Sequence, residues 1–239
     1  MLTRIEPDSA EPIARQVFKA LRHAIVTMQV EPGQALSEKD VASRLGVSRQ
    51  PVREAFIKLG EAGLVVIRPQ RGTFVVRISV RQVLDARFVR EAVEVAVVRK
   101  AAAEMPASGI AALHDNLMAQ RATARQGEAE GFLALDEALH RTIALGVGCD
   151  YAWRVVEETK AQMDRVRYLS LPHATPVDRL IAQHERIVDA IAAHDADAAE
   201  AALCVHLREI LTSLPELEQR FPALFNDDTV PAAEPVRAA

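Results

Sequence analysis

From Val80 to the last quarter of the chain, apolar residues recur at intervals of three and four, and no alternating strand pattern interrupts them. Pro106, Gly127 and Pro176 are among the residues that break this pattern into segments. Aromatic residues make up only 4% of the chain, so the core must be built from Ala, Val, Leu and Ile. We therefore expect a mainly α protein whose larger part is an all-α helical bundle. The spacing predicts helices at residues 80–103, 108–125, 129–146, 151–169, 176–193 and 195–213.

The first 77 residues have a different organisation, with shorter helical segments. An apolar stripe from Ile13 to Met28 predicts one helix, which the following Glu-Pro-Gly turn ends. Ser37 stands three residues before Asp40, a spacing typical of a capped helix start. Gly46 is the expected C-cap of this second helix, which is therefore short.

A third helix and a basic hairpin follow. Ser48 is the expected N-cap, and Pro51 falls in the first turn, where a missing N–H is tolerated. Residues 64–76 have the pattern of two β-branched strands around a turn at 69–72, with Arg68 and Arg71 at the tip. Two helices joined by a tight turn and followed by such a hairpin predict a winged helix-turn-helix, whose second helix enters the major groove of DNA.

The charge of the chain is divided between these two parts. Residues 1–77 hold 12 Lys+Arg and 8 Asp+Glu, a balance of +4, whereas residues 78–239 carry −8. Arg49 and Arg53 lie at the start of the third helix, where cations oppose the helix dipole unless an anion lies nearby. The alternative interpretation is that these arginines are solvated and that the asymmetry is scatter among surface charges. We favour DNA as the anion.

The run LSEKDVASRLGVSRQPVREAFIKLGEAGLVVIRPQRGTFV resembles the winged helix-turn-helix of the GntR family of bacterial transcription regulators. The family signature is a short capped helix, then V-S-R-x-P-V-R-E-A, then G-L and a wing that ends R-G-T-x-V. The resemblance implies DNA contacts by Lys39, Ser48, Arg49, Gln50 and Arg53. It also implies that Gly72 lets the wing backbone approach the minor groove. We expect Lys39 and Arg71 to contact phosphates rather than bases.

Three of the predicted bundle helices carry polar residues on their apolar faces. Asp136 and His140, four residues apart, share one stripe, and His184 and His206 lie on the stripes of two later helices. Burying one carboxylate and three imidazoles is costly unless they are hydrogen-bonded or coordinate a cation, and a divalent metal satisfies all four together. For any one histidine, a hydrogen-bonded core residue is the alternative. The histidines that fit no such stripe are expected at the surface: His23, His114, His173 and His194.

This half of the chain resembles the FCD effector-binding domain found in the FadR subfamily of GntR regulators. The matching stretches are DEALH, QHERIVDAI and VHL. They imply that the metal ligands are Asp136, His140, His184 and His206. Three nitrogens and one oxygen suit Zn, Ni, Mn or Fe, with zinc slightly preferred.

The same resemblance implies an effector that is a small carboxylate held near the metal. Arg90 matches an arginine that faces this pocket in relatives. The alternative for Arg90 is an i,i+4 pair with Glu94 on a solvated face. Weaker candidates for the effector site are Arg87, Arg165 and Arg167.

The chain carries no sign of secretion or of a membrane span. Its first residues, MLTRIEPDSAEP, are charged, and no stretch approaches the ~18 apolar residues that a membrane span requires. Cys149 and Cys204 are too few for a disulfide framework and show no CxxC spacing. We expect a cytoplasmic protein with no membrane partner.

These features predict a DNA-binding transcription regulator with a winged helix-turn-helix at 1–77, an effector- and metal-binding domain at 78–222 and a disordered tail at 223–239. We expect a homodimeric repressor that binds a palindromic double-stranded DNA operator with half-sites about one turn, ~34 Å, apart. A metal sensor is the main alternative. A metal-dependent enzyme has less support, because the sequence holds no HExxH, no Gly-rich phosphate loop and no nucleophile elbow.

Overall fold

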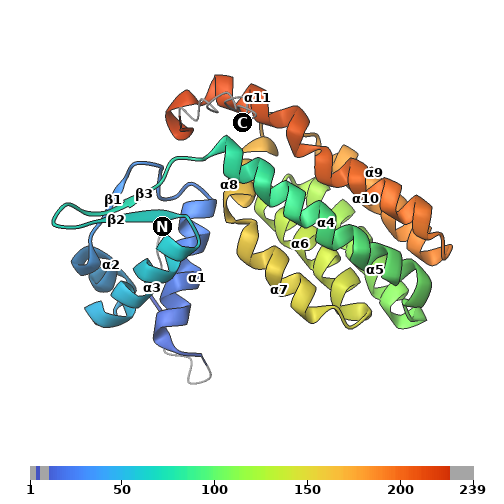
Figure 1. The fold of residues 1–239 in the computed structure, drawn as a ribbon, viewed down its shortest axis with the longest axis horizontal. Helices are drawn as coiled ribbons and strands as arrows, with labels where there is room; N and C mark the ends of the chain where they lie inside the picture. Colours follow the sequence, from blue (N-terminus) through green and yellow to red (C-terminus); the bar gives the residue numbers. More distant parts are fainter. Residues whose placement is uncertain (1–3, 6–10, 227–239) are drawn as a thin grey trace, which may run out of the picture.

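The protein consists of a small N-terminal domain and a larger helical bundle, which lie side by side in Figure 1. The computed structural model describes residues 4–5 and 11–226. The N-terminal domain holds α1 (Ile13–Val26), α2 (Glu38–Leu45), α3 (Arg49–Glu61) and a three-stranded sheet. The mainly α fold expected from the apolar spacing is confirmed.

The caps that define the helix-turn-helix lie where the sequence places them. The Ser37 hydroxyl accepts a hydrogen bond from the Asp40 amide at 3.3 Å and starts α2. Gly46 ends α2 with a φ of 72°, the left-handed conformation that glycine adopts without strain. Ser48 holds the N-cap position of α3, but its side chain makes no capping hydrogen bond, so the expected cap is wrong in this respect.

The wing contains one strand more than the hairpin alone. β2 (Val65–Arg68) and β3 (Gly72–Val75) pair antiparallel, and Arg71 N–H closes the turn on Arg68 C=O at 3.0 Å. β1 (Ala35–Leu36) pairs with the other edge of β3, so the strand order is β1-β3-β2. The two residues of β1 are too few to show a strand pattern in the sequence, and only their pairing with β3 defines them.

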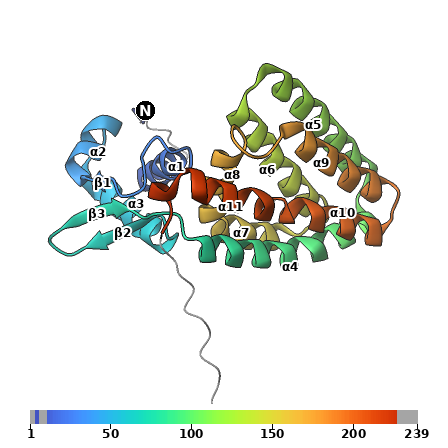
Figure 2. The same ribbon diagram turned by 90° about the horizontal axis from the view of Figure 1, so that it is seen from above.

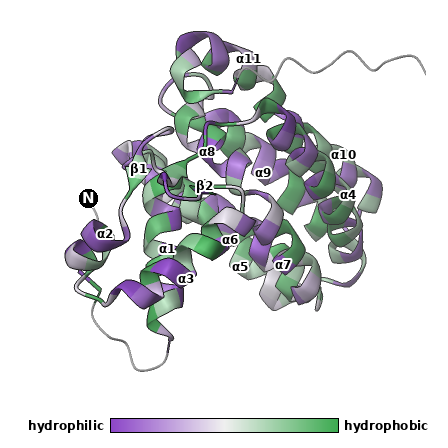
Figure 3. Ribbon diagram, turned by 60° about the vertical axis from the view of Figure 1, so that its left-hand side comes forward, coloured by the Kyte–Doolittle hydropathy of each residue, from purple (hydrophilic) through white to green (hydrophobic). Residues whose placement is uncertain are grey.

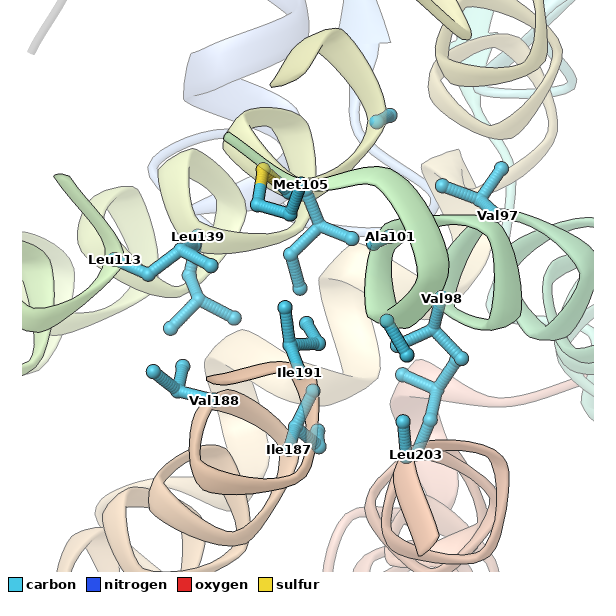
Figure 4. Packing of buried hydrophobic residues seen from close by; sticks show 14 of the residues in the cluster. Val97, Val98, Ala101, Met105, Leu113, Leu139, Ile187, Val188, Ile191 and Leu203 are labelled. Atoms are coloured by element: carbon cyan, nitrogen blue, oxygen red, sulfur yellow. The ribbon is translucent and has the colours of Figure 1, made fainter. Parts of the chain in front are cut away.

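The bundle is built around a core of aliphatic side chains. Figure 4 shows Val98 and Ala101 of one helix facing Ile187 and Ile191 of another, with Met105 above them. This packing of small and branched side chains matches the low aromatic content. The bundle helices are α4 (Val80–Glu104), α5 (Ala107–Gln126), α6 (Ala129–Gly146), α7 (Asp150–Thr159), α8 (Ala161–Ser170), α9 (Val177–Ala192), α10 (Ala196–Arg208) and α11 (Ile210–Arg220).

Two of the expected helices are each divided in the structure. The segment expected at 151–169 breaks at Lys160 into α7 and α8, and the segment at 195–213 breaks at Glu209 into α10 and α11. The break before α8 changes the direction of the chain: α7 and α8 both pack on α4 and α6, but α8 also packs on α1 and α11. α11 also continues through Pro215 to Arg220, beyond its expected end.

The segment directly after residue 222, expected to belong to a disordered tail, packs against the start of the bundle. Ile78 N–H donates to Leu224 C=O at 2.8 Å, and Asn226 N–H donates to Ile78 C=O at 2.9 Å. Phe225 is 2% exposed and packs in a core cluster with Ile78 and Leu217. The segment 223–226 is therefore packed, and the rest of the expected tail, 227–239, lies outside the described residues.

Helix α8 forms much of the contact between the two domains, and Figure 2 shows it next to α1 and α11. Arg22 of α1 donates to Asp164 of α8 at 2.8 Å. The Gln162 amide donates to Gly63 C=O at 2.6 Å, and Arg165 donates to Val76 C=O at 2.9 Å. Within the described residues, no helix has both the length and the apolarity needed to cross a membrane.

Candidate metal centre and nucleic-acid interface

Four buried side chains from three helices converge inside the bundle. Asp136 and His140 project from α6, His184 from α9 and His206 from α10, and one ligand atom of each lies within 4.8 Å of all the others. The Nε2 atom of His206 lies 3.1 Å from Nε2 of His140 and 3.3 Å from Nε2 of His184. Asp136 Oδ1 lies 3.3 Å from His184 Nε2 and 4.0 Å from His206 Nε2.

The outer nitrogen of each histidine has its own acceptor. Nδ1 of His140 lies 2.6 Å from Glu94 Oε2, and Nδ1 of His184 lies 2.8 Å from Gln120 Oε1. Nδ1 of His206 lies 3.2 Å from Gln183 Oε1. Because these acceptors take the Nδ1 protons, the three Nε2 lone pairs point at one another, which is unfavourable unless a cation lies among them.

The carboxylate of Asp136 completes the set. Its Oδ2 accepts from Arg167, whereas its Oδ1, fully buried, has no hydrogen-bond partner among the described residues. Nitrogens bound to one tetrahedral zinc at about 2.0–2.1 Å lie ~3.3–3.4 Å apart. The Nε2–Nε2 distances of 3.1 and 3.3 Å, together with the unsatisfied Oδ1, fit a single divalent ion among the four residues.

The electrostatics favour the protonation states that a metal requires. Burial and the neighbouring imidazoles lower the pKa of His206 well below its ordinary value, and burial lowers the pKa of His184. Burial alone would raise the pKa of Asp136, but Arg167 and the neighbouring histidines together outweigh burial and hold that pKa well below the usual range. Neutral imidazoles and an ionised carboxylate are the forms that bind a cation.

A small cavity of about 40 Å³ adjoins the cluster. Asp136 and His206 line it from the cluster side, and Arg90 and Arg167 contribute two guanidinium groups. Apolar side chains from α6, α9, α10 and α11 supply much of the remaining wall: Leu133, Leu180, Leu207 and Ile210. Glu209 adds a carboxylate, so the cavity combines two guanidinium groups, acidic side chains and an apolar lining beside the candidate metal centre.

Of the four arginines considered for the effector site, two line this cavity and two do not. Arg90 is 2% exposed and donates to Glu94 at 2.5 Å, so the pair with Glu94 exists but the solvated face considered for it is wrong. Arg167, a weaker candidate, lines the cavity. Arg87 pairs with Glu91, and Arg165 contacts Gln162 and Val76, so neither lies with the cavity residues.

The expected DNA-contact residues of α2 and α3 are exposed on one side of the N-terminal domain. Arg49 and Arg53 keep 63% and 57% of their side-chain surface accessible, and Lys39, Ser48 and Gln50 are also exposed. In Figure 3, α2 is mostly hydrophilic in colour, and α3 has both hydrophilic and hydrophobic segments. The hydrophobic face of α3 packs inward through Val52, Ala55, Phe56 and Leu59.

The two arginines are not simply solvated. Arg53 donates from Nε and Nη2 to the two carboxylate oxygens of Glu38 at 3.0 and 3.1 Å, and Arg49 donates to the same carboxylate at 3.0 Å. At the tip of the wing, Arg71 is exposed and Gly72 has a φ of 101°, a conformation that other residues rarely adopt.

Several residues that support these sites were not predicted from the sequence. Gln120 lies on the buried face of α5 with Leu113 and Leu117, and this polar residue on an apolar stripe is the signal that could have identified it. Glu94 stands four residues after Arg90, but nothing in the sequence links it to His140. Glu38 is 11 and 15 positions from the arginines that it binds, so no local spacing reveals the contact.

Comparison with known proteins agrees with this architecture. The family model described as "Bacterial regulatory proteins, gntR family" matches residues 13–75, and the model of the FCD domain matches residues 85–209. The HTH-type transcriptional repressor RspR of Escherichia coli strain K12 is 41% identical over 226 residues, which cover 95% of this chain and 98% of that protein. An uncharacterized HTH-type transcriptional regulator of Streptomyces ambofaciens, in an unstable DNA locus, is 37% identical over 227 residues, with 93% of each chain covered.

Solved structures share the fold. Escherichia coli McbR/YncC superposes with a TM-score of 0.76 at 20% identity, covering 88% of this chain and 99% of that one. A putative GntR transcriptional regulator from Rhodococcus sp. RHA1 gives a TM-score of 0.66 at 24% identity, covering 89% and 99%. The chain therefore belongs to the GntR family of bacterial regulatory proteins, as a transcriptional regulator with an FCD domain rather than an enzyme.

Proposed function

We propose that this protein is a homodimeric repressor whose DNA binding responds to a small carboxylate held beside a divalent metal. Two protomers would present α3 and the wing to a palindromic operator with half-sites ~34 Å apart. Ser48, Arg49, Gln50 and Arg53 would contact the DNA, and Lys39 and Arg71 would contact its phosphates. Gly72 would let the wing backbone approach the minor groove. The 41% identical relative is named a transcriptional repressor, which supports repression rather than activation.

The cavity beside the cluster carries this proposal. Asp136, His140, His184 and His206 would hold the metal, and three nitrogens with one oxygen suit Zn, Ni, Mn or Fe, with zinc slightly preferred. The metal would supply a Lewis-acid site for a carboxylate oxygen. Arg90 and Arg167, on the wall of the same cavity, would donate hydrogen bonds to the carboxylate of such a ligand.

Helix α8 offers a route from the cavity to the DNA-binding domain. Arg167 contacts the candidate metal ligand Asp136 and lies 3.7 Å from Asp164. Asp164 in turn accepts from Arg22 of α1 at 2.8 Å. A ligand carboxylate that binds Arg167 would therefore change the charge balance around a residue that joins the two domains.

Thermal-shift screening tests the effector class. The full-length protein is heated with sugar acids, dicarboxylates, fatty acids and aromatic acids, and a ligand at 100 times its Kd should stabilise it by ~2.7 kcal/mol. The Arg167→Gln variant, tested against the same panel, should lose the shift. If no acid stabilises the protein, or if the variant responds as the wild type does, the effector proposal is wrong.

An electrophoretic mobility assay tests the regulatory output. The probe is DNA flanking the protein's own gene, and retardation should weaken steeply as salt rises, because binding releases counterions from the phosphates. An acid found in the thermal screen should then release the DNA. If metal addition alone changes DNA binding and no acid does, the protein is a metal sensor instead.

A further inference from the structure

Glu38 lies between Arg49 and Arg53, the two arginines in the first turns of α3. Its carboxylate accepts three hydrogen bonds, two from Arg53 and one from Arg49, at 3.0–3.1 Å. The Glu38 side chain is 24% exposed, whereas those of Arg49 and Arg53 are 63% and 57% exposed. The carboxylate is thus the inner member of the group, and the guanidinium groups form its outer surface.

This arrangement explains how the helix tolerates two cations at its positive end. Arg49 and Arg53 oppose the dipole of α3, but Glu38 places an anion beside them. Glu38 is also in the first turn of α2, where a negative charge is favoured. The hydrogen bond from Arg53 lowers the pKa of Glu38, so this carboxylate is ionised at neutral pH.

The hydrogen bonds also fix which donors of Arg53 remain for another acceptor. A guanidinium group has five N–H donors in one plane. The contacts with Glu38 use Nε–H and one hydrogen of Nη2, which form the side edge of the group. The end edge, with Nη1 and the second hydrogen of Nη2, keeps the two parallel donors that match O6 and N7 of guanine in the major groove.

We propose that Glu38 is a positioning residue for DNA readout, which holds Arg53 with its end edge ready for a guanine in the operator. Its negative charge has a second effect, because a carboxylate near the DNA backbone weakens contacts that depend only on phosphate attraction. Glu38 therefore increases the preference for the specific site while lowering affinity for DNA of any sequence.

Binding-site selection from a random double-stranded DNA library, with the full-length wild-type protein, supplies the probe. Competition with variants of the selected site then measures the preference at each guanine. Glu38→Gln should lose about tenfold of the preference at one guanine in each half-site and should bind non-specific DNA more tightly than the wild type does. Loss of the same preference in Arg53→Lys identifies the guanine that Arg53 contacts.

Glu54→Gln is the matched control, because it removes one negative charge from the same exposed region. Glu54 accepts from Gln50 at 3.0 Å, and among the described residues its carboxylate forms no hydrogen bond or ion pair with Arg49 or Arg53. This variant should retain the preference at the Arg53 guanine. Circular dichroism checks that α2, which is capped by Ser37, remains folded in each variant.

A double-mutant cycle separates positioning from a general charge effect. If Glu38 acts through Arg53, Glu38→Gln should cause no further loss of guanine preference in the Arg53→Lys background. Equal guanine preference in Glu38→Gln and the wild type would overturn the proposal. Additive losses in the double variant would overturn it as well.

Discussion

At the scale of single residues, the buried cluster shows how polar side chains are kept in an apolar core. Each imidazole has one nitrogen directed to a partner and one directed to the centre of the cluster. The outer partners Glu94, Gln120 and Gln183 fix the ring orientation and leave the inner lone pairs available. Glu94 is itself held by Arg90, and although burial opposes ionisation, Arg90 and His140 lower the pKa of Glu94 to about 2.

Gln120, the hydrogen-bond partner of His184, should affect metal affinity although it would not itself bind the metal. In Gln120→Ala, Nδ1 of His184 loses its acceptor, so the ring can rotate and its basicity falls. We expect metal affinity to fall by about 10–100-fold, measured by competition with a chromogenic chelator. Gln126→Ala, at an exposed position of the same helix, is the control. Unchanged affinity in Gln120→Ala would show that the cluster does not hold the ion in this way.

At the scale of elements, α8 is an unusually polar helix for its degree of burial. Lys160, at the break before it, is 1% exposed and donates to Glu137 at 2.9 Å and to Asp164 at 2.8 Å. Asp164 also faces Arg22 and Arg167. The break between α7 and α8 is thus accompanied by a buried charge network that the helical pattern alone did not suggest.

Removing the central carboxylate of this network should destabilise the protein. Asp164→Asn leaves the buried Lys160 ammonium with Glu137 as its remaining anion, so the free energy of unfolding should fall by about 3–5 kcal/mol at pH 7. Urea denaturation followed by circular dichroism measures this value. Asp189→Asn, at an exposed position of α9, should change it by less than ~0.5 kcal/mol.

The stabilisation of the fold by Asp164 should also depend on pH and should decrease in acid. Burial would raise its pKa, but the charges of Lys160 and Arg22 outweigh burial and lower it. A lowered folded-state pKa means that the ionised carboxylate stabilises the fold above the unfolded value of 3.8, and that this stability is lost as pH falls through the folded pKa. The stability difference between wild type and Asp164→Asn should therefore be constant from pH 5 upward and shrink below about pH 4. A difference that grows on acidification would contradict this assignment.

At the scale of the whole molecule, the two domains are joined by a short connection and by packed segments. The chain leaves the wing at β3 and enters α4 almost directly, while α8 and the segment at 222–226 pack back toward that junction. A change in the bundle is therefore positioned to alter how the N-terminal domain sits, which the proposed response requires.

Treatment with a chelator tests whether the whole protein is stabilised by a metal in the cluster. With a chelator present, the three inward lone pairs and Asp136 Oδ1 lose their shared partner, so the thermal midpoint should fall, and added Zn²⁺ should restore it. His184→Ala should have a low midpoint that neither treatment changes. A chelator effect of equal size in wild type and His184→Ala would exclude this cluster as the metal site.

Much of the fold and of the candidate sites follows from local sequence. Ser37 and Gly46 fix the ends of α2 because capping depends on residues within one helical turn. The inward placement of Asp136, His140, His184 and His206 follows from their helical spacing with apolar neighbours. These features are determined by interactions within a few residues, which a sequence displays directly.

The remaining features depend on residues that meet only after folding. The breaks at Lys160 and Glu209, the pairing of β1 with β3 and the docking of Phe225 are set by packing between distant segments. The same holds for Gln120 beside His184, 64 positions away, and for Glu38 between the two arginines. The sequence by itself determined which faces carry the chemistry, because helical periodicity is local; the tertiary structure alone decided which partner each group finds, because that choice depends on how the elements pack.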